Sequence, residues 1–227
     1  LLKLDFKPIG LKQFKEVMRR NWGVSKWLSA SAVLQWFSGN LFIVTAGAIL
    51  GSSVVGGIKA TQNIIGVTHI IFQGLENIVP VKASVELTKH GLDGLVEYLK
   101  KIVVIGGAAM VFICLVVMLF SDDLMTLVYG DAYKEYGVAL QWYSVIYLFI
   151  FLCLPLRAGL RALETTRPIF IAYVFMTIFS FSSASILVEE LGLSGALMGM
   201  LGTQIIMVLS LAVSFYHQGK TQYGSVK

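Results

Sequence analysis

Charged residues are scarce in this 227-residue chain. They make up 14% of the sequence and hydrophobic residues 56%, whereas soluble domains average about 25% charged and about 45–50% apolar residues. The shortage of charge excludes an ordinary soluble domain. The surplus of apolar residues excludes a disordered chain, which needs low hydrophobicity and high net charge. Because several uncharged stretches are long enough to span a bilayer, the sequence predicts an integral membrane protein.

Reactive and metal-binding motifs are also missing. Cys114 and Cys153 both lie inside apolar runs and indicate neither a disulfide nor a metal site. The histidines have no ligand spacing, and the sequence contains no HExxH, CxxC or GxSxG motif, no Gly-rich phosphate loop and no paired carboxylates within an apolar run. We therefore predict no catalytic residue, no bound metal, no cofactor and no enzymatic activity.

Six apolar runs approach the ~20 residues that cross a hydrocarbon core of ~30 Å. Transmembrane β-strands are about half as long and alternate in polarity, so the sequence predicts an all-α, polytopic membrane bundle of six transmembrane helices. The predicted spans are about 27–50, 55–79, 102–120, 138–156, 169–188 and 193–216; a basic, amphipathic cytoplasmic segment at 1–26 precedes them and a cytoplasmic tail at 217–227 follows.

The basic residues are segregated between the two sides of these spans. Of the 18 Lys and Arg residues, 16 lie in the N-terminal segment, the second and fourth connections and the tail. Lys134 alone lies in the other connections, and Lys59 lies inside the second span. By the positive-inside rule, both termini are cytoplasmic. The net charge of +5 therefore reflects orientation in a membrane, and we predict no nucleic-acid partner.

Two cytoplasmic stretches, 11–22 and 92–101, have apolar residues at helical spacing on one side and basic residues on the other. Both are predicted to form helices along the membrane surface. They either anchor the protein to anionic lipid headgroups or simply connect the spans and hold the cytoplasmic rim of the bundle.

Polar side chains follow one face of the second span. A charged group at membrane depth costs ~2.5–3.5 kcal/mol on insertion scales, so such groups normally face a bundle interior or a watery cavity. The pattern therefore predicts a hydrated substrate pathway. Asn40 of the first span is a further candidate residue for this pathway. The residues of this polar stripe step along the helix by three and four positions: Lys59, Gln62 with Asn63, Gly66, His69, Gln73, and Glu76 with Asn77. The candidates for the pathway among them are Lys59, Gln62, His69, Gln73, Glu76 and Asn77.

Four members of the stripe also have a structural interpretation. Lys59 is close enough to the outer end of the span for its long stem to reach the interface. Glu76 is close enough to the cytoplasmic end to pair with Lys82 or reach the headgroups, and His69 and Gln73 are placed for interhelical hydrogen bonds. Pro80 removes the backbone donor for the Glu76 carbonyl, which predicts a bend or helix end there.

The fourth connection carries Arg157, Arg161 and Arg167. Arginine guanidinium groups match the geometry of phosphate and diphosphate oxygens, so these residues are candidates for binding a phosphate or lipid headgroup. The same residues also satisfy the positive-inside rule without any ligand.

Several segments together resemble a known family. They are Asn40-Leu-Phe-Ile-Val, Leu50-Gly51 with Val55-Gly56, Gln73-Gly-Leu-Glu-Asn-Ile-Val-Pro80, Leu127-Val-Tyr-Gly130 with Asp131 and Tyr133, and Leu160-Arg-Ala-Leu-Glu-Thr-Thr-Arg-Pro168. Over most of residues 22–216 the chain resembles one six-helix lobe of the polysaccharide flippases, the O-antigen and teichoic-acid exporters of the multidrug, oligosaccharidyl-lipid and polysaccharide exporter superfamily.

This resemblance implies a multi-pass transporter of the bacterial inner membrane. Such a flippase moves an undecaprenyl-diphosphate-linked oligosaccharide to the outer leaflet for surface polysaccharide or lipopolysaccharide synthesis. Its partners would be the lipid-linked oligosaccharide, membrane lipids and other polysaccharide assembly proteins. The resemblance leaves coupling to an ion gradient open, with no ion assigned. A multidrug or metabolite exporter of the same superfamily, or a membrane polymerase or ligase of polysaccharide assembly, is the alternative.

Six spans are half of what such transporters contain. The chain begins at Leu1, without a methionine and without the apolar core and cleavage site of a signal peptide. Residues 1–26 resemble the linker between two lobes. We therefore expect this chain to be the C-terminal lobe of a longer protein, with an N-terminal lobe missing in cis; a complete subunit that pairs with a lobe in trans is the alternative.

Overall fold

The computed structural model describes the fold of residues 11–225, and the side-chain surroundings of Trp22 and of residues 30–220 apart from residue 71. Within these limits every regular element is a helix. In chain order they are α1 (Leu11–Leu50), α2 (Ser52–Gly66), α3 (Thr68–Leu119), α4 (Ser121–Tyr129), the 3-10 helix η1 (Asp131–Tyr136), α5 (Gly137–Ala162) and α6 (Arg167–Ser225). The prediction of an all-α bundle is confirmed.

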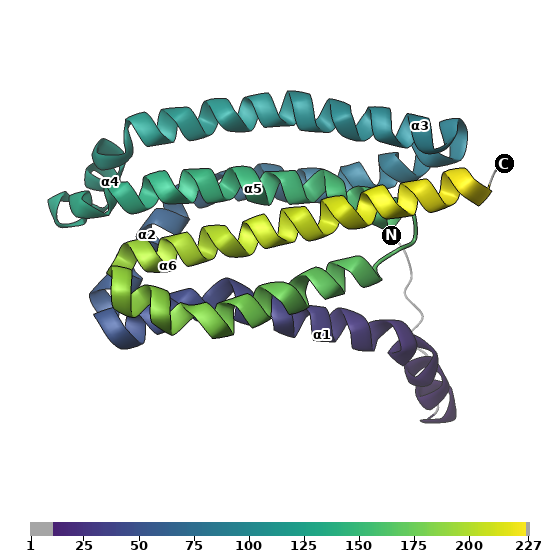
Figure 1. The fold of residues 1–227 in the computed structure, drawn as a ribbon, viewed down its shortest axis with the longest axis horizontal. Helices are drawn as coiled ribbons and strands as arrows, with labels where there is room; N and C mark the ends of the chain where they lie inside the picture. Colours follow the sequence, from purple (N-terminus) through teal and green to yellow (C-terminus); the bar gives the residue numbers. More distant parts are fainter. Residues whose placement is uncertain (1–10, 226–227) are drawn as a thin grey trace, which may run out of the picture.

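Two of the long helices reverse direction at a glycine. Gly91 has φ 65° and ψ −158° within α3, and Gly192 has φ 58° and ψ −134° within α6. A side chain is strained in this left-handed region, which glycine adopts readily. Figure 1 shows that the chain turns back on itself at both places. We call residues 68–90 and 92–119 the first and second arms of α3, and residues 167–191 and 193–225 the first and second arms of α6.

Four helices in the described part of the chain are long and apolar enough to cross a membrane: Ala30–Leu50, Thr68–Leu119, Asp131–Ala162 and Arg167–Lys220. The predicted third span lies in the second arm of α3, the fourth in α5, and the fifth and sixth in the arms of α6. Large apolar side chains cover the outside; Val104, Phe112 and Leu119 are 68%, 68% and 78% exposed. Such a surface suits contact with lipid tails and would be unusual in water.

The predicted second span differs most from the structure. Its helical hydrogen bonding is interrupted at Val67, which separates α2 from α3, although Val67 keeps helical dihedral angles. The helix does not end at Pro80, and Gly91 is the first residue of α3 with non-helical dihedral angles. Pro80 is tolerated because losing one backbone donor leaves the neighbouring hydrogen bonds of a long helix in place.

The two sides of this span pack differently. Its apolar side is buried in the bundle, with Ile58, Ile65, Phe72 and Val79 at most 4% exposed. Its polar stripe lies on the surface of the bundle rather than in its interior. The exposed members are Lys59, Asn63, His69, Gln73, Glu76 and Asn77.

The stretch 92–101 forms the start of the second arm of α3 and is not a separate surface helix. Leu95 and Leu99 are 0% and 6% exposed and pack with Val79 and Leu154, while Lys100 and Lys101 are exposed. The predicted amphipathic pattern is thus present, but its apolar side packs against the protein. The stretch 11–22 is helical and continuous with α1; apart from the exposed Trp22, its side chains lie outside the described residues.

Packing pairs α1 with α6 and α3 with α5, and α5 also contacts α6. The largest buried cluster joins α1, α2, α5 and α6 around Phe42, Ile58, Tyr143 and Leu197. Between membrane helices such packing is favourable mainly through van der Waals contact. Figure 1 places α4 at one end of the bundle, and the described ends of α1 and α6 at the other.

Candidate functional site

A cavity of about 700 Å³ lies between the four long helices. Its walls come from α1, the first arm of α3, α5 and both arms of α6. Several lining side chains, including Trp36, His69 and Arg161, are exposed, so the cavity opens on the bundle surface. The polar residues that line it are Gln35, Ser38, Asn40, His69, Glu76, Arg157, Arg161, Tyr173 and Gln204.

Opposite charges meet in this cavity near the C-terminal end of α5. Arg157 Nη2 of α5 donates a hydrogen bond to Glu76 Oε1 of α3 over 3.0 Å. The two side chains differ in exposure, at 17% for Arg157 and 43% for Glu76. Arg161, one helical turn further along α5, lines the same cavity, and the buried Tyr173 side chain interacts with Arg157. The predicted pairing of Glu76 with Lys82 is therefore wrong, because the carboxylate pairs with Arg157.

Amide groups and aromatic rings also line the cavity. Asn40 Nδ2 donates to the Trp36 carbonyl oxygen over 2.9 Å, which leaves the Asn40 side-chain oxygen as a hydrogen-bond acceptor. Gln204 of α6 lines the same cavity. The His69 ring meets the Phe72 ring edge to face, with centroids 6.3 Å apart. The side-chain amides of Asn40 and Gln204 can both donate and accept hydrogen bonds, so they suit a ligand that carries hydroxyl groups.

Five of the residues that the sequence singled out come together in this cavity: Asn40, His69, Glu76, Arg157 and Arg161. Pro80 lines a small adjoining cavity of about 10 Å³ with Glu76 and Arg157. Arg167 is exposed at the start of α6 and does not line the cavity.

The remaining members of the polar stripe lie elsewhere. Lys59 and Gln62 belong to α2, beyond the interruption at Val67, and Gln62 Nε2 donates to the Tyr143 hydroxyl over 3.0 Å. Gln73 and Asn77 are exposed on α3 outside the cavity wall, and Asn77 Nδ2 donates to the Gln73 carbonyl over 3.0 Å. Their role in a pathway stays a prediction.

Sequence reasoning did not select Gln35, Tyr173 and Gln204 as site residues. Each is an isolated polar group in an apolar run, and such groups usually join helices. Nothing in the sequence marks them as neighbours, because they lie on α1 and on the two arms of α6. Only the packing of the helices brings them to one cavity.

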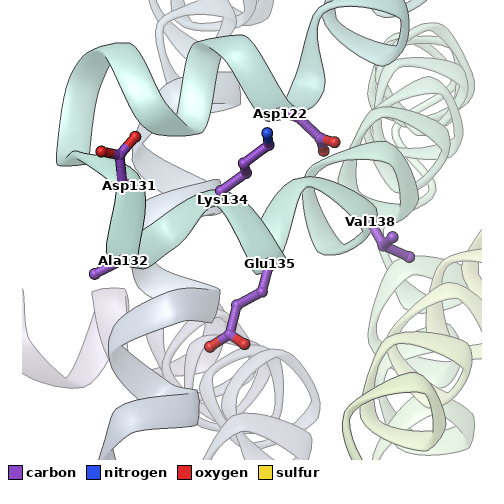
Figure 2. A pocket seen from close by; sticks show the side chains of 6 residues that line it. All are labelled: Asp122, Asp131, Ala132, Lys134, Glu135 and Val138. Carbon is purple, nitrogen blue, oxygen red and sulfur yellow. The ribbon is translucent and has the colours of Figure 1, made fainter.

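A second depression, of about 620 Å³, lies at the opposite end of the molecule, where α4, η1 and α5 meet. Figure 2 shows Lys134 between the carboxylates of Asp122 and Asp131, with Glu135 turned away from them. All of these charged side chains are exposed, so this depression is an ordinary solvated surface. No group of three His, Cys, Asp or Glu side chains among the described residues is placed to hold a metal ion.

The MatE family model matches residues 28–186. This match covers most of the chain, including the cavity walls that α1, α3, α5 and the first arm of α6 contribute. This chain belongs to the MatE family. MatE proteins are membrane transporters of the multidrug and lipid-linked oligosaccharide flippase superfamily, and they are not enzymes. The MatE match thus confirms the predicted superfamily and the predicted transport role. No curated protein and no solved structure matches the chain.

Proposed function

We propose that this MatE chain forms one six-helix lobe of a flippase that moves a lipid-linked oligosaccharide across the bacterial inner membrane. The observation that supports this proposal is the cavity that both Arg157 and Arg161 and the amide groups of Asn40 and Gln204 line. Its volume, about 700 Å³, falls within the range of ligand sites.

The chemistry of the two parts of the cavity fits the two parts of such a headgroup. Guanidinium groups bind phosphate oxygens through paired hydrogen bonds, which suits the diphosphate of an undecaprenyl carrier at Arg157 and Arg161. The amides of Asn40 and Gln204 suit the hydroxyl groups of the attached sugar. The polyprenyl tail would stay outside, against the exposed apolar surface of the helices.

The distribution of charge supports an orientation with both termini in the cytoplasm. Lys100 follows the turn at Gly91 between the two arms of α3, and Arg161 lies in the last turn of α5. Figure 1 places that turn and the connection from α5 to α6 at the end of the bundle that also holds the start of α1 and the end of α6. The opposite end carries Lys134 among the acidic side chains Asp122, Asp131 and Glu135. By the positive-inside rule the first of these ends is cytoplasmic, and the diphosphate would therefore enter at the arginine end of the cavity.

The exposed polar stripe supports a partner lobe. Lys59, His69 and Gln73 are exposed at the depth of the predicted span, where contact with lipid tails is unfavourable. A second six-helix lobe facing this stripe would enclose the cavity and provide a hydrated passage between the two lobes.

Replacement of both His69 and Arg161 tests this function. In cells whose surface polysaccharide export depends on this protein, the variant His69→Leu with Arg161→Gln should reach the membrane in normal amounts. It should export at least about tenfold less polysaccharide, because loss of the charge-assisted hydrogen bond from Arg161 alone costs about 1.5–3 kcal/mol.

The matched control is His217→Leu with Lys100→Gln, which makes the same kinds of change at exposed positions outside the cavity. Normal export by the His69 and Arg161 variant would refute the assigned site. Normal polysaccharide export combined with loss of drug efflux would favour a multidrug exporter instead.

A further inference from the structure

Glu76 is the one carboxylate that lines the arginine-bearing cavity in the described part of the chain. Its Oε1 atom lies 3.0 Å from Arg157 Nη2. A carboxylate and a phosphate offer the same kind of acceptor to a guanidinium group, and both bind it through paired oxygens. Glu76 therefore occupies a donor of Arg157 that an anionic ligand of the cavity would use.

We propose that Glu76 is a built-in competitor for the anion site of Arg157 and Arg161. It occupies Arg157 in the empty cavity, and a phosphate or diphosphate group takes its place when it binds. The proposal rests on the proposed function for the identity of the diphosphate carrier. The competition itself depends only on the chemistry that phosphate groups share, whether free or attached to a lipid.

The unequal exposure of the pair explains why Glu76 is the partner that leaves. Arg157 is 17% exposed and has Tyr173 beside it, so its guanidinium stays in the cavity wall. Glu76 is 43% exposed, and its carboxylate can turn into water. Ion pairs with an exposed partner contribute little net stability, so a ligand with two phosphate groups can displace this carboxylate.

The pair also changes the charge of the cavity. Glu76 neutralises one of the two arginines, so the cavity with the pair formed carries one net positive charge from these three residues. Displacement of Glu76 exposes both guanidinium groups to the ligand. An anion with a single charge gains less from this exchange than a diphosphate, and the competitor therefore favours the ligand of higher charge.

A structural brace between α3 and α5 is the rival explanation of the pair. The two explanations predict opposite effects of removing the carboxylate. A competitor weakens ligand binding, so its removal strengthens binding. A brace holds Arg157 in place, so its removal weakens binding or leaves it unchanged.

Equilibrium binding to the full chain in nanodiscs of zwitterionic lipid tests the proposal, with inorganic pyrophosphate and farnesyl diphosphate as separate probes. Glu76→Gln keeps the shape of the side chain and should bind both probes about fivefold more tightly than the wild type, the upper range for an exposed pair. Arg157→Gln should bind weakly, and the double variant should bind as weakly as Arg157→Gln alone.

Glu86→Gln is the matched control, because Glu86 pairs with His90 at 2.8 Å and does not line the cavity. It should bind as the wild type does. Glu76→Ala should also bind more tightly than the wild type. This variant has no side-chain amide, so its gain could not come from a new contact between the ligand and the amide of Glu76→Gln. A gain with farnesyl diphosphate alone supports the proposal and identifies a lipid-linked ligand; an equal gain with both probes supports it for the phosphate group by itself.

Unchanged or weaker binding by Glu76→Gln, a gain that persists without Arg157, or no binding by any variant would overturn the proposal. Export assays separate this failure from that of the proposed function. Tighter binding by Glu76→Gln in a protein that does not export polysaccharide would retain the competitor and refute the flippase. Loss of export on replacing His69 and Arg161, with no effect of Glu76→Gln on binding, would retain the flippase and refute the competitor.

Discussion

Gly199 lies where the second arm of α6 packs against Phe42 of α1, and its replacement by alanine gives a direct test of this packing. A methyl group at Gly199 would overlap the ring of Phe42. That ring is 0% exposed and lies 6.2 Å, between centroids, from the ring of Phe179. Because Phe42 sits inside the largest buried cluster, it cannot turn aside without disturbing its neighbours.

Two opposing terms determine the size of the effect. Alanine stabilises the interior of a helix by up to about 1 kcal/mol relative to glycine. Insertion of a carbon into a well-packed core costs about 1–3 kcal/mol. Since the overlap involves ring atoms of a fully buried side chain, the second term dominates, and we expect Gly199→Ala to lower the free energy of unfolding by about 1–2 kcal/mol.

Thermal unfolding of the purified protein in detergent measures this loss. For a chain of this size, 1 kcal/mol shifts Tm by roughly 2–4 °C, so Tm should fall by several degrees. Gly74→Ala is the matched control: it lies inside the first arm of α3 with nothing within 4 Å of the added carbon, and its Tm should stay the same or rise. Addition of Phe42→Leu to Gly199→Ala should restore part of the loss. A Tm of Gly199→Ala at or above the wild-type value would refute the close approach of α1 and α6.

Two further predictions concern the buried hydroxyl of α5 and the orientation in the membrane. The Tyr143 hydroxyl accepts a hydrogen bond from Gln62 over 3.0 Å and lies 3.2 Å from Met200 Sδ; Tyr143→Phe should therefore cost about 1 kcal/mol in the same thermal assay, and an unchanged Tm would show that these contacts do not stabilise the fold. With both termini cytoplasmic, a cysteine at Lys134 should react with a membrane-impermeant maleimide in intact cells, whereas one at Lys100 should react only after permeabilisation; the reverse pattern would contradict the orientation.

The sequence predicts best those features that depend on local composition. Long apolar runs identify the bundle, and the turns at Gly51, Gly91 and Gly192 fall in or beside the predicted connections because these segments interrupt the apolar runs. Local patterns predict the end of a helix less well, because a long helix persists when one of its hydrogen bonds is missing. Pro80 lacks a backbone donor, yet α3 continues past it to Gly91.

The partners of individual side chains are beyond local reasoning. Glu76 has Lys82 as a neighbour in sequence, but it pairs with Arg157, which is 81 residues away. Tyr173 and Gln204 belong to the cavity only because the two arms of α6 pack beside α1 and α5. Such contacts depend on how the helices cross, and a single sequence carries little information about that geometry.

The interruption at Val67 divides the predicted second span into two parts, α2 and the first arm of α3, which pack against different neighbours. On one side of Val67, α2 is tied to the large buried cluster through Ile58, Ile65 and the Gln62 contact with Tyr143. On the other side, the first arm of α3 packs against α5 through the buried side chains of Phe72 and Val79 and through the exposed ion pair of Glu76. The hydrogen bonds around Val67 are long, at 3.5 Å to Ile64 and 3.3 Å from Ile70. The helix is therefore easiest to bend at its middle, and a movement of the first arm of α3 relative to α2 would take place about Val67.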